Sequence, residues 1–295
     1  MHQTGQIYRP PSEAFTPRLE VTIGCSHNKC KFCTMYRKTP FSVSPLEDVE
    51  ADLAELKKTG DKIPRLFLTN GDPFVLSTEK LVEIAELVHK YLPEVEILTC
   101  YASIQNIKSK SLEDLKLLKS HGYDELYVGL ETAYAPAVEM INKGFTVEEA
   151  YENIGKLIEA GMRYNALIMM GIGGKGKSEE NVRETVKLLN QYKPYRVSAL
   201  STSVLKGSEL AELRDKGEYV ELTEREMVEE EKLLLRSLDI EGVDFFGSHP
   251  YNLITISGIL PQDREMIIEH LDSEMAAWDR DQPGFLDTTM NRWDM

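Results

Sequence analysis

Three of the four cysteines in this chain lie within nine residues, and this cluster constrains the protein more than any other feature of its sequence. Cys25, Cys30 and Cys33 have the spacing Cys-x4-Cys-x2-Cys and directly follow a strand-like run at residues 18–23. In a chain with the appearance of an intracellular protein, thiols at this density favour a metal centre over disulfides. The sequence therefore predicts a metal-binding loop after the first strand.

Three kinds of centre are compatible with this spacing. A structural zinc ion needs four ligands, and the candidates for the fourth are His27 within the loop and Cys100 in a different strand-like run. A plant-type [2Fe–2S] centre has the same spacing and also needs a distant cysteine such as Cys100. Three thiolates on one loop suit a [4Fe–4S] cluster with one iron left open, and this interpretation is favoured.

Six strand-like runs alternate with helical patterns along the chain. The expected strands are 18–23, 65–69, 96–101, 125–130, 164–170 and 196–200, and the expected helices are 44–60, 78–91, 111–120, 146–160, 178–191 and 223–238. Ser44 and Glu47 have the spacing of a capping box at the first helix. Repeated βα units predict an α/β fold with a parallel sheet, whose functional residues gather at the carboxyl ends of the strands.

Charge and hydropathy argue against several functional classes. The chain has 49 acidic and 34 basic residues among 295, a net charge of −15, which opposes non-specific binding to nucleic acid. It does not exclude a local basic patch beside the cysteines, formed by Lys29, Lys31, Arg37 and Lys38. No run approaches 18 apolar residues and the N-terminus has no signal-peptide pattern, so we expect a soluble, cytoplasmic protein without a membrane partner.

The cysteine loop, with Phe32 before its last cysteine and βα repeats after it, resembles the radical S-adenosylmethionine (SAM) superfamily. The usual spacing in that family is Cys-x3-Cys-x2-Cys, so this loop is one residue longer. The resemblance covers roughly residues 17–245 and implies a partial (β/α)6 TIM barrel. It also implies that Cys25, Cys30 and Cys33 ligate a [4Fe–4S] cluster to which SAM binds.

The resemblance divides the chain at residue 245. Residues 1–245 are expected to form the barrel, with a short N-terminal arm at 1–17, and residues 246–295 an extension that covers the barrel opening. Aromatic residues including Trp278, Phe285 and Trp293 lie in this extension, which we expect to have a short helix at about 262–272 and polar turns rather than a long helix.

The turn after the second strand, Asn70-Gly71-Asp72-Pro73, occupies the place of the family's Gly-Gly-Glu-Pro motif. By resemblance, Asn70, Gly71 and Asp72 hold the amino group of SAM. An aspartate reaches one methylene less far than the glutamate of the motif. Without the cysteine loop before it, the same sequence would be read as an ordinary turn.

Glu131 and Lys143 resemble a pair in the branch that contains elongator-type enzymes and oxygen-independent coproporphyrinogen oxidases. In that branch a polar residue at the end of the fourth strand contacts SAM, and a basic residue twelve positions later binds its carboxylate. Lysine offers a point charge where some members have the fork of arginine. The alternative for Lys143 is a solvated residue near a helix cap.

A glycine-rich turn follows the fifth strand. Gly171-x4-Gly176-Lys177-Ser178 satisfies the P-loop pattern, but a P-loop normally follows the first strand of its domain. The resemblance instead implies that Ile172 and Gly173 pack against the adenine of SAM.

Further candidates are less sharply indicated. Ser103 after the third strand is a candidate SAM contact, and Tyr101, His249 and Asn252 are candidate substrate contacts. Cys100 is expected to be a small buried residue.

The predicted function is that of a radical SAM enzyme acting on a small molecule or peptide, reduced by an electron donor such as flavodoxin or ferredoxin. The alternatives are an RNA-modifying radical SAM enzyme and a non-catalytic iron–sulfur or zinc protein. Nothing in the sequence identifies the substrate.

Overall fold

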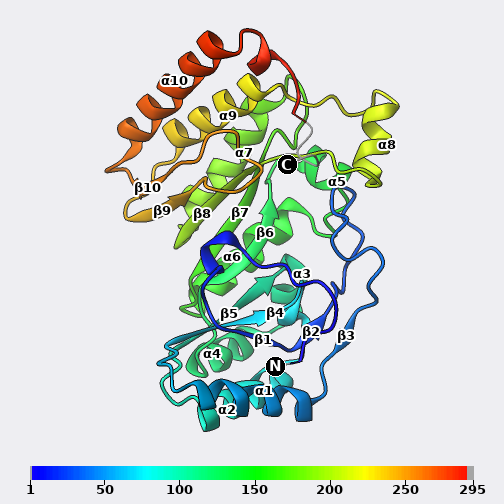
Figure 1. Cartoon of the computed structure of the whole chain (residues 1–295), viewed down its shortest axis with the longest axis vertical. Coiled ribbons are helices and arrows are strands. Elements are labelled where there is room, and N and C mark those ends of the chain that lie inside the picture. Colours follow the sequence, from blue (N-terminus) through cyan, green and yellow to red (C-terminus); the bar gives the residue numbers. More distant parts are fainter. Residues whose placement is uncertain (1, 291–295) are drawn as a thin grey trace. The chain divides into compact units, whose positions relative to one another are not determined.

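The structure is a computed structural model that describes residues 2–290, and its chain forms two compact units (Figure 1). The first unit comprises Met1–Asn28, Met35–Gly129 and Tyr151–Asn165, and the second comprises Lys29–Thr34, Leu130–Ala150 and Ala166–Met295. The chain passes between the units several times. Strands β6 (Leu126–Glu131) and β7 (Tyr164–Met170) therefore contribute residues to both.

The first unit contains parallel strands in the order β1-β4-β5-β6. Its strands before β6 are β1 (Arg18–Glu20), β2 (Thr22–Ile23), β3 (Ser42–Val43), β4 (Arg65–Thr69) and β5 (Ile97–Ala102). Its helices are η1 (Pro11–Glu13), α1 (Leu46–Thr59), η2 (Pro73–Val75), α2 (Thr78–Tyr91), α3 (Ile104–Lys108) and α4 (Leu112–Ser120), and it shares α6 (Val147–Glu159) with the second unit. Figure 1 shows α1, α2 and α4 on one side of these strands.

Apolar residues on both faces of the central strands explain why the first unit is a layered α/β structure. Leu66, Phe67 and Leu68 of β4 are fully buried, as expected for a parallel strand covered on both faces. On one of these faces, Phe67 makes edge-to-face contacts with Tyr101 and Tyr127, with ring centroids 5.7 and 5.9 Å apart.

The N-terminal arm is attached to the first unit through buried charges. The guanidinium of Arg65, the first residue of β4, donates hydrogen bonds to Glu13 in η1 and also pairs with Glu125. The hydroxyl of Tyr127 donates to Glu13 at 2.6 Å. The arm therefore contacts β4 at its first residue.

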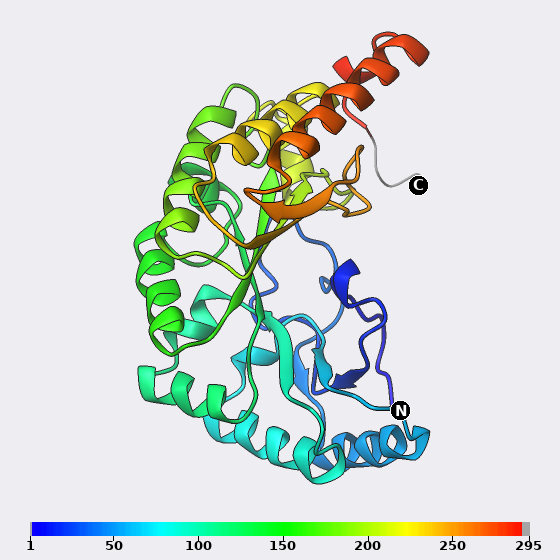
Figure 2. The ribbon, with the colours of Figure 1, turned by 90° about the vertical axis from the view of Figure 1, so that its left-hand side faces the viewer.

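The second unit contains the carboxyl-terminal parts of β6 and β7, followed in the sheet by β8, β9 and β10. Its further elements are α5 (Ala135–Met140), α7 (Ser178–Gln191), β8 (Arg196–Ser201), α8 (Glu209–Asp215), α9 (Glu224–Ser237), β9 (Val243–Phe246), β10 (Ser257–Leu260), α10 (Arg264–Asp281) and η3 (Phe285–Asp287). Strand β9 is parallel to β8, whereas β10 is antiparallel to β9. Helices α9 and α10 lie side by side (Figure 2).

The predicted fold class is confirmed: the fold is α/β and the sheet is mostly parallel. All six expected strands are present as β1 and β4 to β8, and the expected helices are α1, α2, α4, α6, α7 and α9. In the described residues the sheet has eight strands with an open order from β1 to β10. After the six expected strands, β9 and β10 add an antiparallel pair to the sheet.

Two local predictions about the first strand and first helix were wrong. The run 18–23 is divided into β1 and β2, since β2 leaves the main sheet to pair antiparallel with β3. Helix α1 begins at Leu46 after Pro45, and no side chain caps it. The hydroxyl of Ser44 is buried and makes no hydrogen bond with the described residues. The helix does end at Gly60 in the left-handed conformation, as predicted.

The C-terminal segment contains the helix expected at about 262–272, but α10 has 18 residues and continues to Asp281, so the expectation of no long helix was wrong. Trp278 at its end stacks on Phe285, with ring centroids 4.9 Å apart. Trp293 lies outside the described residues. The division at residue 245 and the role of this segment as a cover stay predictions.

No helix in residues 2–290 combines the length and apolar character needed to cross a membrane.

Candidate active site

The cysteine loop begins in the first unit and continues in the second. Cys25, Cys30 and Cys33 are partly exposed thiols. Gly24, directly before Cys25, has φ +75°, and a Cβ there would approach the carbonyl oxygen of Thr39 to 3.0 Å. Glycine is therefore required where the strand turns into the loop.

Cys100 differs from the three loop cysteines. It is fully buried in β5, and burial raises the pKa of its thiol well above the ordinary value. Because the thiolate is the metal-binding form, the donor set that fits a cluster is the partly exposed Cys25, Cys30 and Cys33. In residues 2–290 no three Cys, His, Asp or Glu side chains are grouped as a ready-made ion site.

The turn after β4 is connected to the start of the cysteine loop within the first unit. The amide of Gly71 donates to the carbonyl of Gly24 at 3.1 Å, and the Ser26 hydroxyl donates to the carboxylate of Asp72. Asp72 is 3% exposed. The sequence predicted that this turn and this loop are neighbours, and in the first unit they are.

Asn70 is fully buried and its amide nitrogen is used for structure. Its Nδ2 donates to Glu20 and to the carbonyl of Thr22, both at 3.2 Å. Its Oδ1 is buried and accepts no hydrogen bond from the described residues. An unpaired buried acceptor is costly, so this atom has capacity for a donor that the chain itself does not supply.

The candidates at the end of β5 have defined structural roles. The Ser103 hydroxyl accepts a hydrogen bond from the Asn106 amide, and Asn106 Oδ1 accepts one from the Ser103 amide, which together form a capping box for α3. Tyr101 lies in the aromatic group with Phe67 and Tyr127 and is partly exposed.

A buried lysine supports the segment after the β4 turn, and no sequence pattern indicates it. Lys110, 4% exposed, donates from Nζ to the carbonyls of Phe74 at 2.8 Å and Leu76 at 3.0 Å. Burial lowers its pKa to about 8.

In the second unit the structure brings Glu131, Lys143 and Phe32 together. Lys143 Nζ lies 2.8 Å from Glu131 Oε1 and 5.8 Å from the centroid of the Phe32 ring. Burial alone would lower the Lys143 pKa, but the negative charges of Glu131 and then Cys30 raise it above the ordinary value. The spacing of twelve residues in the sequence therefore corresponds to an ion pair.

Glu131 has an unusual backbone conformation at the end of β6. Its φ is +61°, in the left-handed region that side chains with a Cβ rarely adopt. Such strain costs on the order of 1–3 kcal/mol and is concentrated at functional sites. The conformation supports a functional role for this residue.

Backbone hydrogen bonds hold the second part of the cysteine loop. The amide of Lys31 donates to the carbonyl of Ile141 at 2.8 Å, and the carbonyl of Lys31 accepts from the amide of Leu210 at 2.9 Å. Asn142, itself at φ +53°, donates to the carbonyl of Lys29 at 3.1 Å. These contacts come from α8 and from the two residues directly after α5. Both α5 and α8 are short helices that the sequence did not predict.

The turn after β7 packs against the same region. Ile172 is fully buried in an apolar cluster, against which Phe32 also packs. Gly171 has φ +80°, and a Cβ on it would lie 2.5 Å from the Met227 side chain. Phe32 and Ile172 are therefore members of one apolar group, next to the ion pair of Glu131 and Lys143.

The P-loop alternative is not supported by the contacts of its two polar residues. Lys177 Nζ pairs with Glu180 at 3.2 Å, and the Ser178 hydroxyl donates to Glu230 at 2.5 Å. Both are engaged with carboxylates, the opposite of what a phosphate site requires.

His249 and Asn252 lie in the segment between β9 and β10. The amide of Tyr251 donates to His249 Nδ1 at 3.1 Å, so the neutral ring carries its proton on Nε2. Burial lowers the His249 pKa to about 4. Asn252 is 8% exposed; its Oδ1 accepts from the Ser201 amide, and its Nδ2 donates to the Gly247 carbonyl. Asn252 thus joins the ends of β8 and β9.

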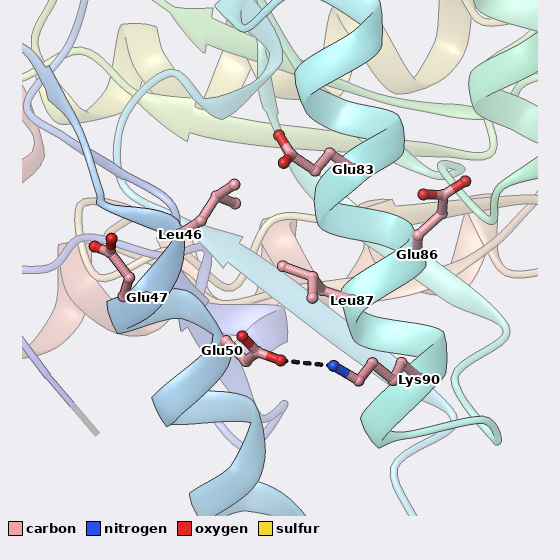
Figure 3. Close-up of a pocket in the computed structure, with 7 residues that line it drawn as sticks. All are labelled: Leu46, Glu47, Glu50, Glu83, Glu86, Leu87 and Lys90. Atoms are coloured by element: carbon pink, nitrogen blue, oxygen red, sulfur yellow. Dashed lines mark hydrogen bonds and ion pairs between the residues drawn. The ribbon is translucent and has the colours of Figure 1, made fainter.

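A hollow of about 400 Å³ lies between α1 and α2 in the first unit (Figure 3). Its lining residues are Leu46, Glu47, Glu50, Glu83, Glu86, Leu87 and Lys90. Lys90 pairs with Glu50 at 2.7 Å. None of the predicted site residues lines this hollow, and its carboxylates do not suit an anionic ligand.

A second hollow, of about 470 Å³, lies in the second unit where α5 meets α6. Lys143 and Asn142 belong to its wall. One member of the candidate site is therefore next to a surface depression.

Comparison with known proteins identifies the family. Residues 19–189, more than half of the chain, match the model of the radical SAM superfamily. An uncharacterized protein of Methanocaldococcus jannaschii is 26% identical over 221 residues, 71% of this chain and 67% of that protein. The heme chaperone HemW of Bacillus subtilis is 25% identical over 158 residues, 51% of this chain and 41% of HemW.

Solved structures share the fold at low sequence identity. Elp3 of Methanocaldococcus infernus has a TM-score of 0.56 at 16% identity, covering 88% of this chain and 63% of that one. Methylornithine synthase PylB has a TM-score of 0.54 at 15% identity, covering 88% and 81%. The cobalamin-dependent SAM radical enzyme OxsB has a TM-score of 0.59 at 14% identity, covering 75% and 41%. This chain spans less than two thirds of HemW, Elp3 and OxsB.

The match over residues 19–189 includes the cysteine loop and the strand ends that carry the candidate SAM-binding residues. The chain belongs to the radical SAM superfamily, whose members are enzymes that use a [4Fe–4S] cluster and SAM.

Proposed function

We propose that this protein is a radical SAM enzyme in which Cys25, Cys30 and Cys33 hold a [4Fe–4S] cluster. The cluster and SAM, when bound, supply a 5′-deoxyadenosyl radical that abstracts hydrogen from a substrate. The residues of the chain bind and orient SAM and exclude water from the reacting centre.

The observation that carries the proposal is the group formed by Phe32, Glu131, Lys143 and Ile172 in the second unit. It combines a cation for a carboxylate, a polar residue at a strand end and an apolar surface for an adenine ring. The paired Glu131 fixes the position of the Lys143 ammonium. In this proposal Lys143 binds the SAM carboxylate, Glu131 its ribose or methionine part, and Ile172 and Gly173 its adenine.

In the first unit, Asn70, Gly71 and Asp72 are assigned to the SAM ammonium. Asp72 supplies a buried carboxylate, and Asn70 Oδ1 is an acceptor that no described residue satisfies. An ammonium has three donors and suits such a group of oxygen acceptors. Ser103, as the capping residue of α3, is assigned a place beside SAM.

The substrate is proposed to be a small molecule or a peptide. His249 can donate one hydrogen bond from Nε2, and Tyr101 offers a partly exposed phenol. Asn252 remains a candidate, although its amide already makes three hydrogen bonds within the chain. We further propose a cytoplasmic enzyme reduced by flavodoxin or ferredoxin, with no nucleic-acid partner.

The test is anaerobic reconstitution of the full chain with iron and sulfide. We expect about four irons per chain, with the broad visible absorbance of an iron–sulfur cluster, and binding of SAM. Zinc alone at one ion per chain, or a stable two-iron centre, would contradict the proposal. Salt-sensitive co-purification of RNA would instead favour the RNA-modifying alternative.

A further inference from the structure

The side chain of Glu230 in α9 is 2% exposed and lies against the turn after β7. Its Oε1 accepts hydrogen bonds from the amide of Gly171 at 2.9 Å and from Asn181 Nδ2 at 2.7 Å. Its Oε2 accepts from the Ser178 hydroxyl at 2.5 Å. One buried carboxylate therefore contacts the first residue of the turn and the first two turns of α7.

The network continues to the end of β6. Asn181 Oδ1 accepts from the hydroxyl of Thr132 at 2.5 Å, and Thr132 directly follows Glu131. The Thr132 hydroxyl also accepts a hydrogen bond from the amide of Tyr134 at 2.8 Å. A continuous chain of hydrogen bonds thus joins the segment after Glu131, through Asn181 and Glu230, to Gly171.

The direction of each hydrogen bond in this network is determined by the chemistry of its groups. A carboxylate only accepts hydrogen bonds, so Asn181 must direct its nitrogen to Glu230. Its oxygen then faces Thr132 and accepts from the hydroxyl. Burial raises the pKa of Glu230, and the hydrogen bonds that its carboxylate accepts oppose this shift. Satisfied buried polar networks specify one arrangement of the segments they join.

The neighbouring Glu231 provides an internal contrast. It is 5% exposed, but its Oε1 makes no hydrogen bond with the described residues. It approaches Gly247 rather than the β7 turn: a Cβ on Gly247 would lie 2.8 Å from Glu231 Oε1. Two adjacent buried glutamates on one helix therefore differ in whether they contact the candidate SAM-binding segments.

We propose that Glu230 is a positioning residue that holds the turn at 171–174 and the β6 end at 131–132 in the arrangement that binds SAM. This inference rests on the proposed function, because that function assigns Glu131, Ile172 and Gly173 to SAM. Glu230 itself touches neither SAM nor substrate. It acts through Gly171 on one side and through Asn181 and Thr132 on the other.

The experiment compares Glu230→Ala, Glu230→Gln and the control Glu231→Gln in the full chain with its cluster reconstituted. Measurements are iron content, the dissociation constant for SAM, and hydrogen exchange of the amides at 171–174. Glu230→Ala should retain iron but bind SAM at least tenfold more weakly, with faster exchange in the turn. Glu230→Gln should remain within threefold of the wild type, because its oxygen can still accept from Gly171 and Asn181 while its amide donates to Ser178.

Glu231→Gln should leave the SAM affinity and the exchange at 171–174 unchanged. If Glu230→Ala does not fold, Asn181→Ala and Thr132→Val interrupt the same network and should weaken SAM binding in the same direction. SAM affinity within twofold of the wild type in Glu230→Ala, or in both of these variants, would overturn the inference. A wild-type protein that holds iron but binds no SAM would instead overturn the proposed function, while hydrogen exchange would still report whether Glu230 holds the turn.

Discussion

Two turns that carry candidate SAM contacts, one in each unit, are held by buried charges of opposite sign. In the first unit the ammonium of Lys110 donates to the carbonyls of Phe74 and Leu76, next to the turn that contains Asp72. In the second unit the carboxylate of Glu230 accepts a hydrogen bond from the amide of Gly171. Neither charged residue lies near its turn in sequence.

The difference follows from which backbone groups each turn leaves unpaired. A strand or helix satisfies its own amides and carbonyls, but an irregular turn at the end of a strand cannot do so. The segment directly after the first turn directs the carbonyls of Phe74 and Leu76 inward, and the donor Lys110 binds them. The second turn directs the amide of Gly171 inward, and the acceptor Glu230 binds it. Burial shifts each residue toward its neutral form, lowering the pKa of Lys110 to about 8 and raising that of Glu230.

The largest expected effect concerns the cysteines, which also differ between two regions: three are partly exposed in the loop and Cys100 is buried in β5. Replacing Cys25, Cys30 or Cys33 by Ala should abolish the iron–sulfur absorbance and SAM cleavage, because thiolates hold the cluster. Cys100→Ala should leave both intact, since its thiol is fully buried. Loss of the cluster in Cys100→Ala would favour a centre with four cysteine ligands.

Charge reversal directly tests Lys110 and Glu230, the two buried charged residues that bind these segments. Lys110→Glu and Glu230→Lys should each lower the free energy of unfolding in urea by at least about 3 kcal/mol, since each buried polar group left unpaired costs about 1–3 kcal/mol. Reversal of the exposed Lys116 or Glu241 serves as the matched control and should cost less than about 0.5 kcal/mol. If reversal at Lys110 or Glu230 lowers the free energy of unfolding by less than about 1 kcal/mol, the adjacent turn does not depend on that charge.

The SAM contacts themselves should have intermediate effects. Asp72→Ala in the first unit and Glu131→Ala in the second should each weaken SAM binding by about 1.5–3 kcal/mol, the range for a hydrogen bond to a charged group. Isothermal titration of the reconstituted protein measures this, with iron content as the control. Unchanged affinity in one of them would assign SAM binding mainly to the turn of the other unit.

The smallest effect concerns pH and Glu231, the buried carboxyl without the hydrogen bonds of Glu230. Burial raises its pKa from 4.5 to about 8, so the folded protein holds this proton more tightly than the unfolded chain. Its contribution to stability is therefore greatest at low pH and is lost as the pH rises from about 4.5 to 8. Glu231→Gln should gain stability relative to the wild type as the pH rises through this window, by no more than about 1.4 kcal/mol per pH unit. A difference that does not change with pH would contradict this assignment.

Periodic patterns and local spacing made much of the fold predictable from the sequence. Strand β4, helix α2 and helix α7 have the predicted bounds, because each has a regular apolar period and clear ends. The short elements α3, α5, α8, β9 and β10 were missed, since four to seven residues give too little periodicity. The Ser44 cap was predicted from a local motif, but Pro45 precedes the helix without a side-chain cap.

The candidate site was predictable only in part for the same reason. The cysteine spacing and the interval from Glu131 to Lys143 are local signals, and the structure places Glu131 and Lys143 in an ion pair. Lys110 and Glu230 contact turns that are 34 to 59 residues away in sequence, and no local pattern marks them. Glu230 does lie among the buried apolar residues of α9, but the adjacent Glu231 is buried there too, so this pattern does not single out Glu230.

The central claim is that this chain uses a cluster held by three cysteines to cleave SAM. The most direct measurement is the formation of 5′-deoxyadenosine from SAM by the anaerobically reconstituted full chain with dithionite as reductant. We predict that the wild type and Cys100→Ala form 5′-deoxyadenosine, whereas Cys33→Ala forms none. A wild-type protein that contains about four irons and binds SAM, yet forms no 5′-deoxyadenosine with dithionite or with a reduced flavodoxin, would contradict the claim.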